Sequence, residues 1–323
     1  MMTALFGGTG PEWVAREIPV PEVGPGQLLV RVRAAGLNNA DVPVLAATDP
    51  TVGGTGEQYQ AGYEFAGEVA AVGSGVPGVA VGDRVMGTQP RSFAQYALTD
   101  HRHVLRIPEA IGFDEAAALP TGLLTEHGAL ELGAFEAGQS VLITGATSAI
   151  GLLGVQIAKV LGASTVIGTT RSPSKEALLV SAGADVVVVG DDVTEEALEA
   201  TDGEGVDVVL DHVGGRTFAS CLPATRIDGH LVNIGRLDRA ESTINLDHLS
   251  HRHLHLRGVS FGFGRPAELG EVMAALVPEV LPAVADGRIR PIIDEVFPFD
   301  RAVEAADRLR TGQANGKIVL SVP

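Results

Sequence analysis

The sequence contains few residues of several kinds, and each scarcity excludes a class of protein. Cys221 is the only cysteine in 323 residues, so the chain has no disulfide framework and no cysteine-rich structural zinc lobe. Aromatic residues make up 4% of a chain that is 45% hydrophobic, so its core consists mainly of aliphatic side chains. Basic residues number 23 against 40 acidic ones, and the net charge of −17 argues against binding to nucleic acid or to an anionic membrane surface.

Long hydrophobic runs are also missing. No apolar run reaches the length of a transmembrane helix, and residues 1–10 do not resemble a signal peptide. We therefore expect a cytoplasmic protein, and 323 residues are enough for two domains of ordinary size.

Residues 140–162 carry the pattern of a dinucleotide-binding turn. The apolar run Val141–Ile143 predicts a short buried parallel strand, and small residues from Gly145 to Gly151 predict a tight turn after it. A helical stripe of apolar residues then runs to Gly162. In this order, the backbone N–H groups and the dipole at the start of the helix can meet a pyrophosphate.

The glycine fingerprint of that turn is incomplete. At the G-x-G-x-x-G spacing the chain has Ala146, Ser148 and Gly151, so two glycines are replaced. A turn built from small residues for packing alone is therefore an alternative interpretation. The residues that we expect to contact a pyrophosphate are Ala146, Thr147, Ser148, Ala149, Ile150 and Gly151.

The next strand, expected at residues 164–168, favours NADPH over NADH. Enzymes that use NAD place an acidic residue at its end to hold the ribose 2′-hydroxyl, and this chain has none there. Arg171 instead offers a planar, forked guanidinium group, Ser172 offers a neutral hydrogen-bond donor, and Lys175 offers a compact positive charge. Together with Thr170 beside them, these side chains suit a 2′-phosphate.

A structural interpretation of the same segment is compatible with this one. Ser172 and Pro173 are typical residues for the start of a helix, here expected at 174–182. The two cations would then lie on its solvated face.

The order of predicted elements indicates an α/β protein with two domains. Short runs separated by proline- and glycine-rich turns predict mostly β structure up to about residue 110. A helix is expected at 114–131. Strands rich in valine, isoleucine and leucine then alternate with helices, as in a doubly wound parallel sheet, and a helix at 266–286 follows them. A strand–helix–strand tail returns to the first domain. We expect the mostly-β domain at 1–116 and 288–323 and the nucleotide-binding domain at 117–287.

Further motifs are spread over nearly the whole chain: Val30–Asp41, Ala61–Val69, Val81–Val85, Ala117–Pro120, Val206–Gly215 and Asn315–Val319. Together with the turn from Gly145 to Gly151, these motifs resemble those of the medium-chain dehydrogenase/reductase superfamily. Within that superfamily, the chain is most similar to the zinc-independent quinone oxidoreductase branch. The resemblance implies a GroES-like catalytic domain and a Rossmann domain that binds the nicotinamide cofactor.

The chain departs from the zinc-using members of that superfamily at two positions. Where they have Gly-x-Cys-x-x-Asp this chain has Asn38 for the cysteine, and where they have Gly-His-Glu it has Tyr63 for the histidine. Asparagine and tyrosine are poor zinc ligands, so we expect no metal. The resemblance places both side chains at the substrate site. A phenol with an ordinary pKa of about 10 is protonated at neutral pH and can donate to an enolate oxygen. The alternative is that Tyr63 is a core aromatic of a strand.

The resemblance also assigns contacts at the cofactor. Thr125 matches a threonine at the nicotinamide end, so we count it with Asn38 and Tyr63 as a candidate catalytic residue. Lys317 is alternatively a solvated residue at the start of a strand. The positions assigned to cofactor contacts are Thr125, Val213, Ile234, Gly235, Phe261, Gly262, Asn315 and Lys317.

Four histidines lie close together in the sequence, at 248, 251, 253 and 255. Imidazoles at short spacing can bind metal, but no cysteine or carboxylate completes a helical site here. We favour a surface or subunit-interface role for them.

These observations together predict a zinc-independent, NADPH-dependent reductase of quinones or α,β-unsaturated carbonyl compounds, acting as a homodimer. An enoyl-thioester reductase of a biosynthetic pathway shares the chemistry and is a second interpretation. A non-catalytic NADPH-binding protein is a third, because two glycines of the turn are lost.

Overall fold

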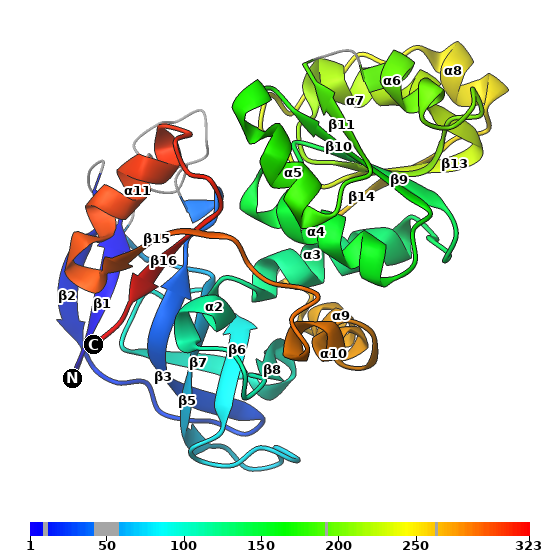
Figure 1. The fold of residues 1–323 in the computed structure, drawn as a ribbon. Coiled ribbons are helices and arrows are strands. Elements are labelled where there is room, and N and C mark those ends of the chain that lie inside the picture. The colour runs from blue at the N-terminus through cyan, green and yellow to red at the C-terminus, as the bar shows by residue number, and fades with distance from the viewer. Residues whose placement is uncertain (9–11, 42–57, 191–192, 262–263) are drawn as a thin grey trace. The chain divides into compact units, whose positions relative to one another are not determined.

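The computed structural model describes residues 1–8, 12–41, 58–190, 193–261 and 264–323 (Figure 1). The chain divides into two compact units. Unit 1 comprises Met1–Thr121, Gly262–Val277 and Arg290–Pro323, and unit 2 comprises Gly122–Phe261 and Pro278–Ile289.

These units differ from the expected domain boundaries mainly in residues 264–277. This segment belongs to unit 1 because it lies against residues 101–105. His103 Nε2 is 3.0 Å from the carbonyl oxygen of Pro266, and a Cβ on Gly270 would lie 3.0 Å from Cβ of Arg102.

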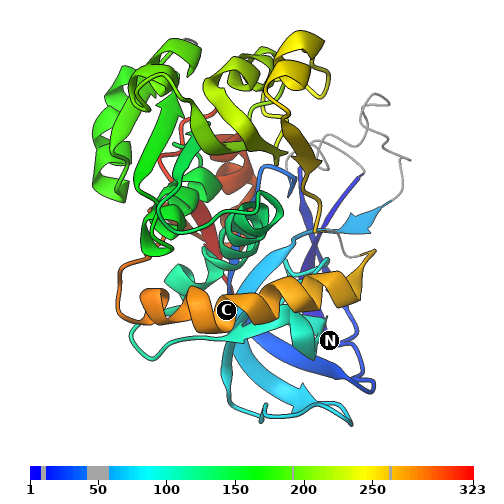
Figure 2. The same cartoon turned by 90° about the vertical axis from the view of Figure 1, so that its right-hand side faces the viewer.

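Unit 1 is built mainly from antiparallel strands. A small sheet has the order β2-β1-β4, and a larger one has the order β15-β16-β3-β5-β6-β8, with β7 also paired to β3. The strands are β1 (Met2–Gly7), β2 (Val14–Ile18), β3 (Gln27–Gly36), β4 (Tyr59–Gln60), β5 (Glu64–Val72), β6 (Arg84–Thr88), β7 (Tyr96–Asp100), β8 (Val104–Arg106), β15 (Ile293–Pro298) and β16 (Lys317–Ser321). In Figure 2 the strands from the first third of the chain run from blue to cyan, and those of the tail are orange to red.

The longest pairing in unit 1, between β3 and β5, carries the centre of its core. Leu28, Val30, Val32 and Phe65 on these strands are fully buried. Trp13 packs edge-on against Phe93, with ring centroids 5.1 Å apart, in the same core.

Prolines divide two helices that periodicity predicts as continuous. The expected helix from residue 114 to 131 is α2 (Phe113–Ala117) followed by α3 (Pro120–Leu132), because Pro120 disfavours helical geometry in the preceding residue and starts a new helix. The expected helix from 266 to 286 is α9 (Pro266–Glu279) and α10 (Leu281–Ala285), with Val280 between them. The tail contributes α11 (Ala302–Arg310).

Unit 2 contains a six-stranded sheet in which every described pairing is parallel. Its order is β11-β10-β9-β12-β13-β14, so the chain starts in the middle, winds to one edge and then returns to the other. The strands are β9 (Ser140–Thr144), β10 (Thr165–Thr170), β11 (Val186–Val189), β12 (Val206–Asp211), β13 (Thr225–Asn233) and β14 (His255–Gly258).

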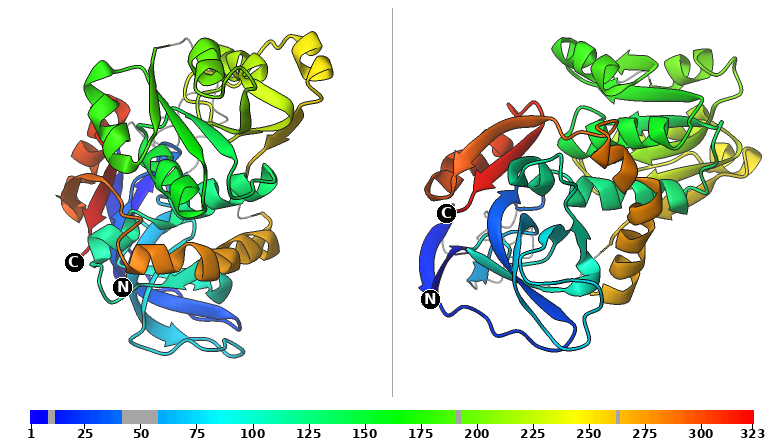
Figure 3. Two further views of the ribbon diagram at one scale, coloured as in Figure 1. Left: turned by 45° about the vertical axis from the view of Figure 1, so that its right-hand side comes forward. Right: turned by 60° about the horizontal axis from the view of Figure 1, so that its bottom comes forward.

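The helices of unit 2 cover both faces of this sheet (Figures 1 and 3). Because crossovers between parallel strands are right-handed, α4 and α5 lie on one face, and α6, α7 and α8 lie on the other. They are α4 (Ala149–Val160), α5 (Glu176–Ala182), α6 (Val193–Glu199), α7 (Gly215–Ala224) and α8 (Leu246–His251).

The doubly wound parallel sheet predicted from the sequence is confirmed. Its strand order reverses between β9 and β12, and in such sheets ligands bind at the carboxyl ends of the strands beside the reversal. Within the described residues, no helix has both the length and the apolar character needed to cross a bilayer.

Candidate functional site

The turn after β9 presents the start of α4. Ser148 is the N-cap of this helix, and its Oγ accepts a hydrogen bond from Gly151 N at 3.1 Å. The backbone ladder begins with Leu152 N donating to Ser148 O at 2.9 Å. The N–H groups of Ala149 and Ile150 precede that ladder, as the first N–H groups of any helix do, and this makes them available to an anion.

Close packing explains which glycines of the fingerprint are kept. A Cβ on Gly151 would lie 2.8 Å from Cα of Ala146, so any side chain at 151 would force the turn away from the helix. Ala146 fits at the first glycine position because Gly168 of β10 faces it. A Cβ on Gly168 would lie 3.3 Å from the Ala146 methyl carbon. The absence of a side chain at Gly168 thus leaves room for the Ala146 methyl group.

Two threonines tie the turn to the end of β10. Thr169 receives hydrogen bonds from two turn N–H groups, Gly145 N to its Oγ1 and Ala146 N to its carbonyl oxygen, both at 3.0 Å. Thr170 Oγ1 lies 3.4 Å from Thr147 Oγ1. The predicted pyrophosphate turn and the predicted 2′-phosphate segment therefore lie side by side.

The residues predicted to bind a 2′-phosphate directly follow β10. Arg171 is exposed, while Ser172 and Lys175 are half-buried. Ser172 occupies the N-cap position of a single 3-10 turn with Pro173 at its first residue, as the structural interpretation expects. Its hydroxyl makes no cap bond, however, and lies 2.8 Å from Ser174 Oγ.

Asp211, which the sequence pattern does not single out, organises the carboxyl ends of β12 and β13. Its buried carboxylate accepts hydrogen bonds from Thr144 Oγ1 at 2.7 Å and from Asn233 Nδ2 at 2.8 Å. Its carbonyl oxygen accepts from Ile234 N at 2.7 Å and from Gly235 N at 3.0 Å. The predicted contacts Ile234 and Gly235 are therefore held by hydrogen bonds at this edge. Val213, two residues after Asp211, is half-buried there.

A second feature missed from the sequence is the buried ion pair of His212 and Glu126. His212 Nε2 lies 2.9 Å from Glu126 Oε1, and the two side chains are 4% and 0% exposed. Burial lowers the pKa of His212, but the charge of Glu126 and its hydrogen bond, with the charge of Asp211, outweigh this and raise it above its ordinary value. Thr125, the residue before Glu126 on α3, is half-buried.

Of the two cofactor contacts predicted to follow the last strand of the sheet, one lies among the described residues. Phe261 is half-buried beyond the end of β14. Gly262 lies outside the described residues.

In unit 1, the chain brings together Asn38 from the loop after β3, Glu64 from β5 and Lys317 from β16. Lys317 Nζ lies 2.5 Å from Glu64 Oε2 and donates to Asn38 Oδ1 at 2.7 Å. Asn38 Nδ2 in turn donates to the same Glu64 oxygen at 3.0 Å. The other oxygen of Glu64 accepts from Thr121 N at 2.8 Å.

The interpretation of Lys317 as a solvated residue is wrong. It does begin a strand, but its side chain is 3% exposed and is paired with Glu64, which is 0% exposed. Asn315, which the sequence analysis groups with it, is exposed, and its N–H donates to Asp294 Oδ1 at 3.0 Å.

The residues present do not fit a catalytic zinc. The Asn38 amide is committed to Glu64 and to the Lys317 ammonium, a cation that already fills the place between them. Cys221 is buried in α7 of the other unit.

Asp41 completes the loop around Asn38. Its Oδ2 accepts from Asn38 N at 2.7 Å, and the side chain is buried. Burial raises the pKa of Asp41 to about 7, although the bond from Asn38 and the charge of Lys317 act in the opposite direction.

Tyr63 lies immediately before β5 and is half-buried, so it is not a core aromatic within the strand. Burial first, and then the charge of Asp41, raises its pKa above the ordinary value. The preceding Gly62 has φ +96° and would place a Cβ 2.3 Å from Phe93, so the backbone here requires glycine. Tyr59 of β4 packs against Gly7 of β1 and has a structural role.

The four clustered histidines do not form a metal site among the described residues. His255 stacks on His230 of the neighbouring strand, with ring centroids 4.5 Å apart. The exposed His253 lies 3.6 Å from Asp228. The segment is yellow in Figure 2.

Two family models match the chain: the zinc-binding dehydrogenase model at residues 149–277 and the alcohol dehydrogenase GroES-like domain at 24–131. Quinone oxidoreductase-like protein 2 of Bos taurus is 31% identical over 96% of this chain and 89% of its own length. The 2-methylene-furan-3-one reductase of Solanum lycopersicum is 32% identical over 94% of this chain and 74% of its own. The chain belongs to the medium-chain dehydrogenase/reductase superfamily, with a GroES-like and a Rossmann domain, and is similar to its quinone oxidoreductase-like members.

Other relatives are much longer. The spectinabilin polyketide synthase system protein NorB of Streptomyces orinoci is 35% identical over 94% of this chain, but the chain spans only 14% of NorB. Among solved structures, mycobacterial Rv1454c complexed with NADPH has a TM-score of 0.85 and 28% identity, covering 99% of this chain and 100% of that one. The CurK enoyl reductase has a TM-score of 0.85 and 25% identity over 100% of this chain and 99% of its own.

Proposed function

We propose that the protein is a zinc-independent reductase that transfers hydride from NADPH to a quinone or an α,β-unsaturated carbonyl compound. The observation that carries this proposal is the cluster of Asn38, Glu64 and Lys317. At the position where zinc-using relatives have a metal ligand, this chain has an amide bonded to a buried ammonium. Conjugated carbonyls are electrophiles that accept hydride without a metal.

NADPH supplies a hydride from its nicotinamide ring when bound. The N–H groups at the start of α4 suit the pyrophosphate, and the exposed Arg171 with Ser172 and Lys175 suits the 2′-phosphate. Val213, Ile234, Gly235 and Thr125 are then available to the rest of the cofactor. The complex of Rv1454c with NADPH supports this assignment.

Tyr63 is the proposed proton donor. As hydride reaches the β-carbon of the substrate, negative charge develops on the carbonyl oxygen and needs a donor. Because burial and Asp41 raise the pKa of Tyr63, its phenol is protonated at neutral pH and can give that proton. Lys317 and Glu64 hold the Asn38 amide in a fixed position in the same unit.

The cofactor assignment is tested with Arg171→Ala. Losing one charge-assisted contact weakens NADPH binding by about 1.5–3 kcal/mol and leaves NADH binding nearly unchanged. Calorimetric titration of both cofactors measures this, with Arg257→Ala, an exposed arginine on β14, as the matched control. Equal losses for NADPH and NADH would overturn the 2′-phosphate assignment.

Tyr63→Phe tests the proton donor. We expect kcat to fall while the dissociation constant for NADPH stays the same, since only the phenol oxygen is removed. Tyr96→Phe, a half-buried tyrosine on β7, is the control. Unchanged turnover in Tyr63→Phe would remove this residue from the mechanism.

A second candidate function is reduction of an enoyl thioester. It is favoured by the match to polyketide synthases, of whose length this chain spans 5% to 14%, and by the likeness to the CurK enoyl reductase. Comparing kcat/KM for a crotonyl thioester with that for a quinone separates the two. Tight NADPH binding without turnover would instead support a non-catalytic binding protein.

We also propose that the protein is a cytoplasmic homodimer. Light scattering after size exclusion tests the dimer, and a mass of one chain would contradict it.

A further inference from the structure

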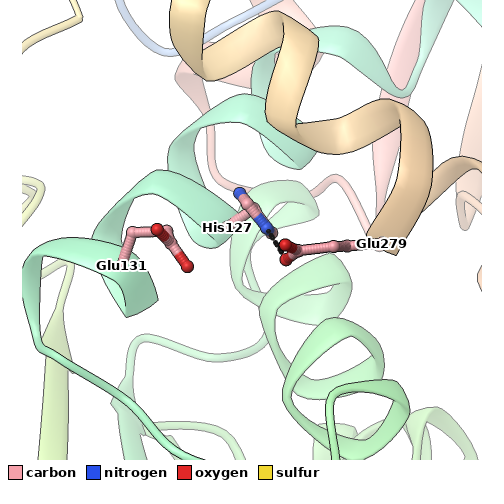
Figure 4. Close-up of side chains that lie close together, drawn as sticks. All are labelled: His127, Glu131 and Glu279. Atoms are coloured by element: carbon pink, nitrogen blue, oxygen red, sulfur yellow. Dashed lines mark hydrogen bonds and ion pairs between the residues drawn. The ribbon is translucent and has the colours of Figure 1, made fainter.

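A buried histidine and two glutamates converge in unit 2, apart from the residues assigned above. Figure 4 shows His127 and Glu131 on α3 and Glu279 at the end of α9. His127 Nε2 lies 2.7 Å from Glu279 Oε2. One potential ligand atom from each of the three residues lies within 4.8 Å of the others.

The three side chains differ in exposure in a way that suits an ion arriving from solvent. The His127 ring is 1% exposed, so packing fixes its orientation. Glu279 is 46% exposed and Glu131 is also exposed, so both carboxylates can move. Within the described part of the chain, His127 Nδ1 has no hydrogen-bond partner.

The electrostatics of the two helix ends favour a cation. Glu131 lies in the last turn of α3 and Glu279 in that of α9, and neither last turn contains a basic residue. The carboxyl end of a helix carries partial negative charge, so a carboxylate there is unfavourable unless a cation accompanies it. His127 is the partner of Glu279, and no ion pair holds Glu131 among the described residues. One positive ion would offset the negative charge of both carboxylates and the partial negative charge of both helix ends.

We propose that His127, Glu131 and Glu279 form a binding site for a divalent transition metal of the zinc, cobalt and nickel group. Imidazole nitrogen with carboxylate oxygens is a ligand set that such ions accept, whereas magnesium and calcium prefer oxygen alone. The ion takes the place of the hydrogen bond between His127 Nε2 and Glu279, and water fills the open coordination position.

The ligand atoms need only small movements. Zinc lies about 2.1 Å from nitrogen and oxygen ligands, which in a tetrahedral site places the ligands about 3.4 Å apart. The contact between His127 and Glu279 must therefore open slightly while Glu131 closes in. Two long, exposed glutamate side chains supply this movement, and the buried imidazole stays fixed.

The site has a structural consequence. An ion held by α3 and the end of α9 links two segments of unit 2 that are far apart in the sequence. Thr125 and Glu126 lie on the same helix as His127. The metal therefore stabilises the helix that carries a candidate cofactor contact, and it takes no part in hydride transfer.

The test is calorimetric titration of ZnCl₂ into the full-length protein after treatment with EDTA and desalting. We expect one saturable site per chain, and a melting temperature that rises with added zinc. Glu131→Gln and Glu279→Gln should each weaken zinc binding at least about tenfold, because each removes a ligand. Glu271→Gln, an exposed glutamate on α9, is the matched control and should bind zinc as the wild type does.

The histidine-rich segment around α8 is the rival location for zinc. His251→Gln should leave binding unchanged if the site is at α3. Absence of saturable binding, full affinity in Glu131→Gln and Glu279→Gln, or loss of binding in His251→Gln would each overturn the proposal. Since both glutamates are exposed, the two glutamine variants are expected to fold, and their melting temperatures without metal check this.

Discussion

Asp41 makes the stability of unit 1 depend on pH in an unusual direction. Its side chain is 2% exposed, its Oδ2 accepts from Asn38 N, and its Oδ1 has no partner within the described residues. Burial raises its pKa to about 7 from 3.8. Between these two values the folded chain holds a proton that the unfolded chain has released.

The free energy of unfolding therefore falls as the pH rises from about 4 to 7, since the folded state binds more protons there. Each pKa unit corresponds to about 1.36 kcal/mol, so the full effect is at most about 4 kcal/mol, of which about 2.3 kcal/mol falls between pH 5 and pH 7. Asp41→Asn removes the titration and keeps an oxygen for Asn38 N. We expect this variant to gain stability over the wild type as the pH rises.

Trp13 provides the assay. It is the only tryptophan and is buried in unit 1, so its fluorescence during urea denaturation follows this unit specifically. Wild type, Asp41→Asn and the exposed control Asp300→Asn are compared at pH 5, 6, 7 and 8. A constant stability difference between wild type and Asp41→Asn over this range would refute the raised pKa.

Two further substitutions test the packing described above. Lys317→Met leaves the buried Glu64 charge unpaired and should cost about 3–5 kcal/mol in the urea assay. The double variant with Glu64→Gln should lose less than this single variant, and additive losses would show that the pair is not coupled. Gly151→Ala places a methyl group 2.8 Å from Cα of Ala146 and should cost about 1–3 kcal/mol and weaken NADPH binding. Gly258→Ala, whose Cβ would meet no atom within 4 Å, should do neither.

Local patterns were enough to predict the nucleotide-binding unit. The apolar run at 141–143, the small-residue turn and the following helix are adjacent in the chain, so spacing alone places them. The prediction that residues 114–131 form one helix was wrong because periodicity does not register the effect of Pro120 on the residue before it.

Long-range contacts could not be predicted in the same way. Lys317 and Asn38 are 279 positions apart, and a lone lysine at the start of a strand has the pattern of a solvated residue. Only the pairing of β16 with β3, and of β3 with β5, brings its ammonium to Asn38 and Glu64. The role of Asp211 could not be predicted for the same reason, because it depends on β9, β12 and β13 lying side by side in the sheet.

The central proposal is hydride transfer from NADPH to a conjugated carbonyl. It is tested most directly by following cofactor oxidation, with NADPH and NADH in parallel. The acceptors are a benzoquinone, a bulky naphthoquinone, a simple enone, an aldehyde and a crotonyl thioester. We expect turnover with NADPH on the quinones or the enone and little with NADH or the aldehyde. Bound NADPH with no oxidation on any acceptor, or equal rates with both cofactors, would contradict it.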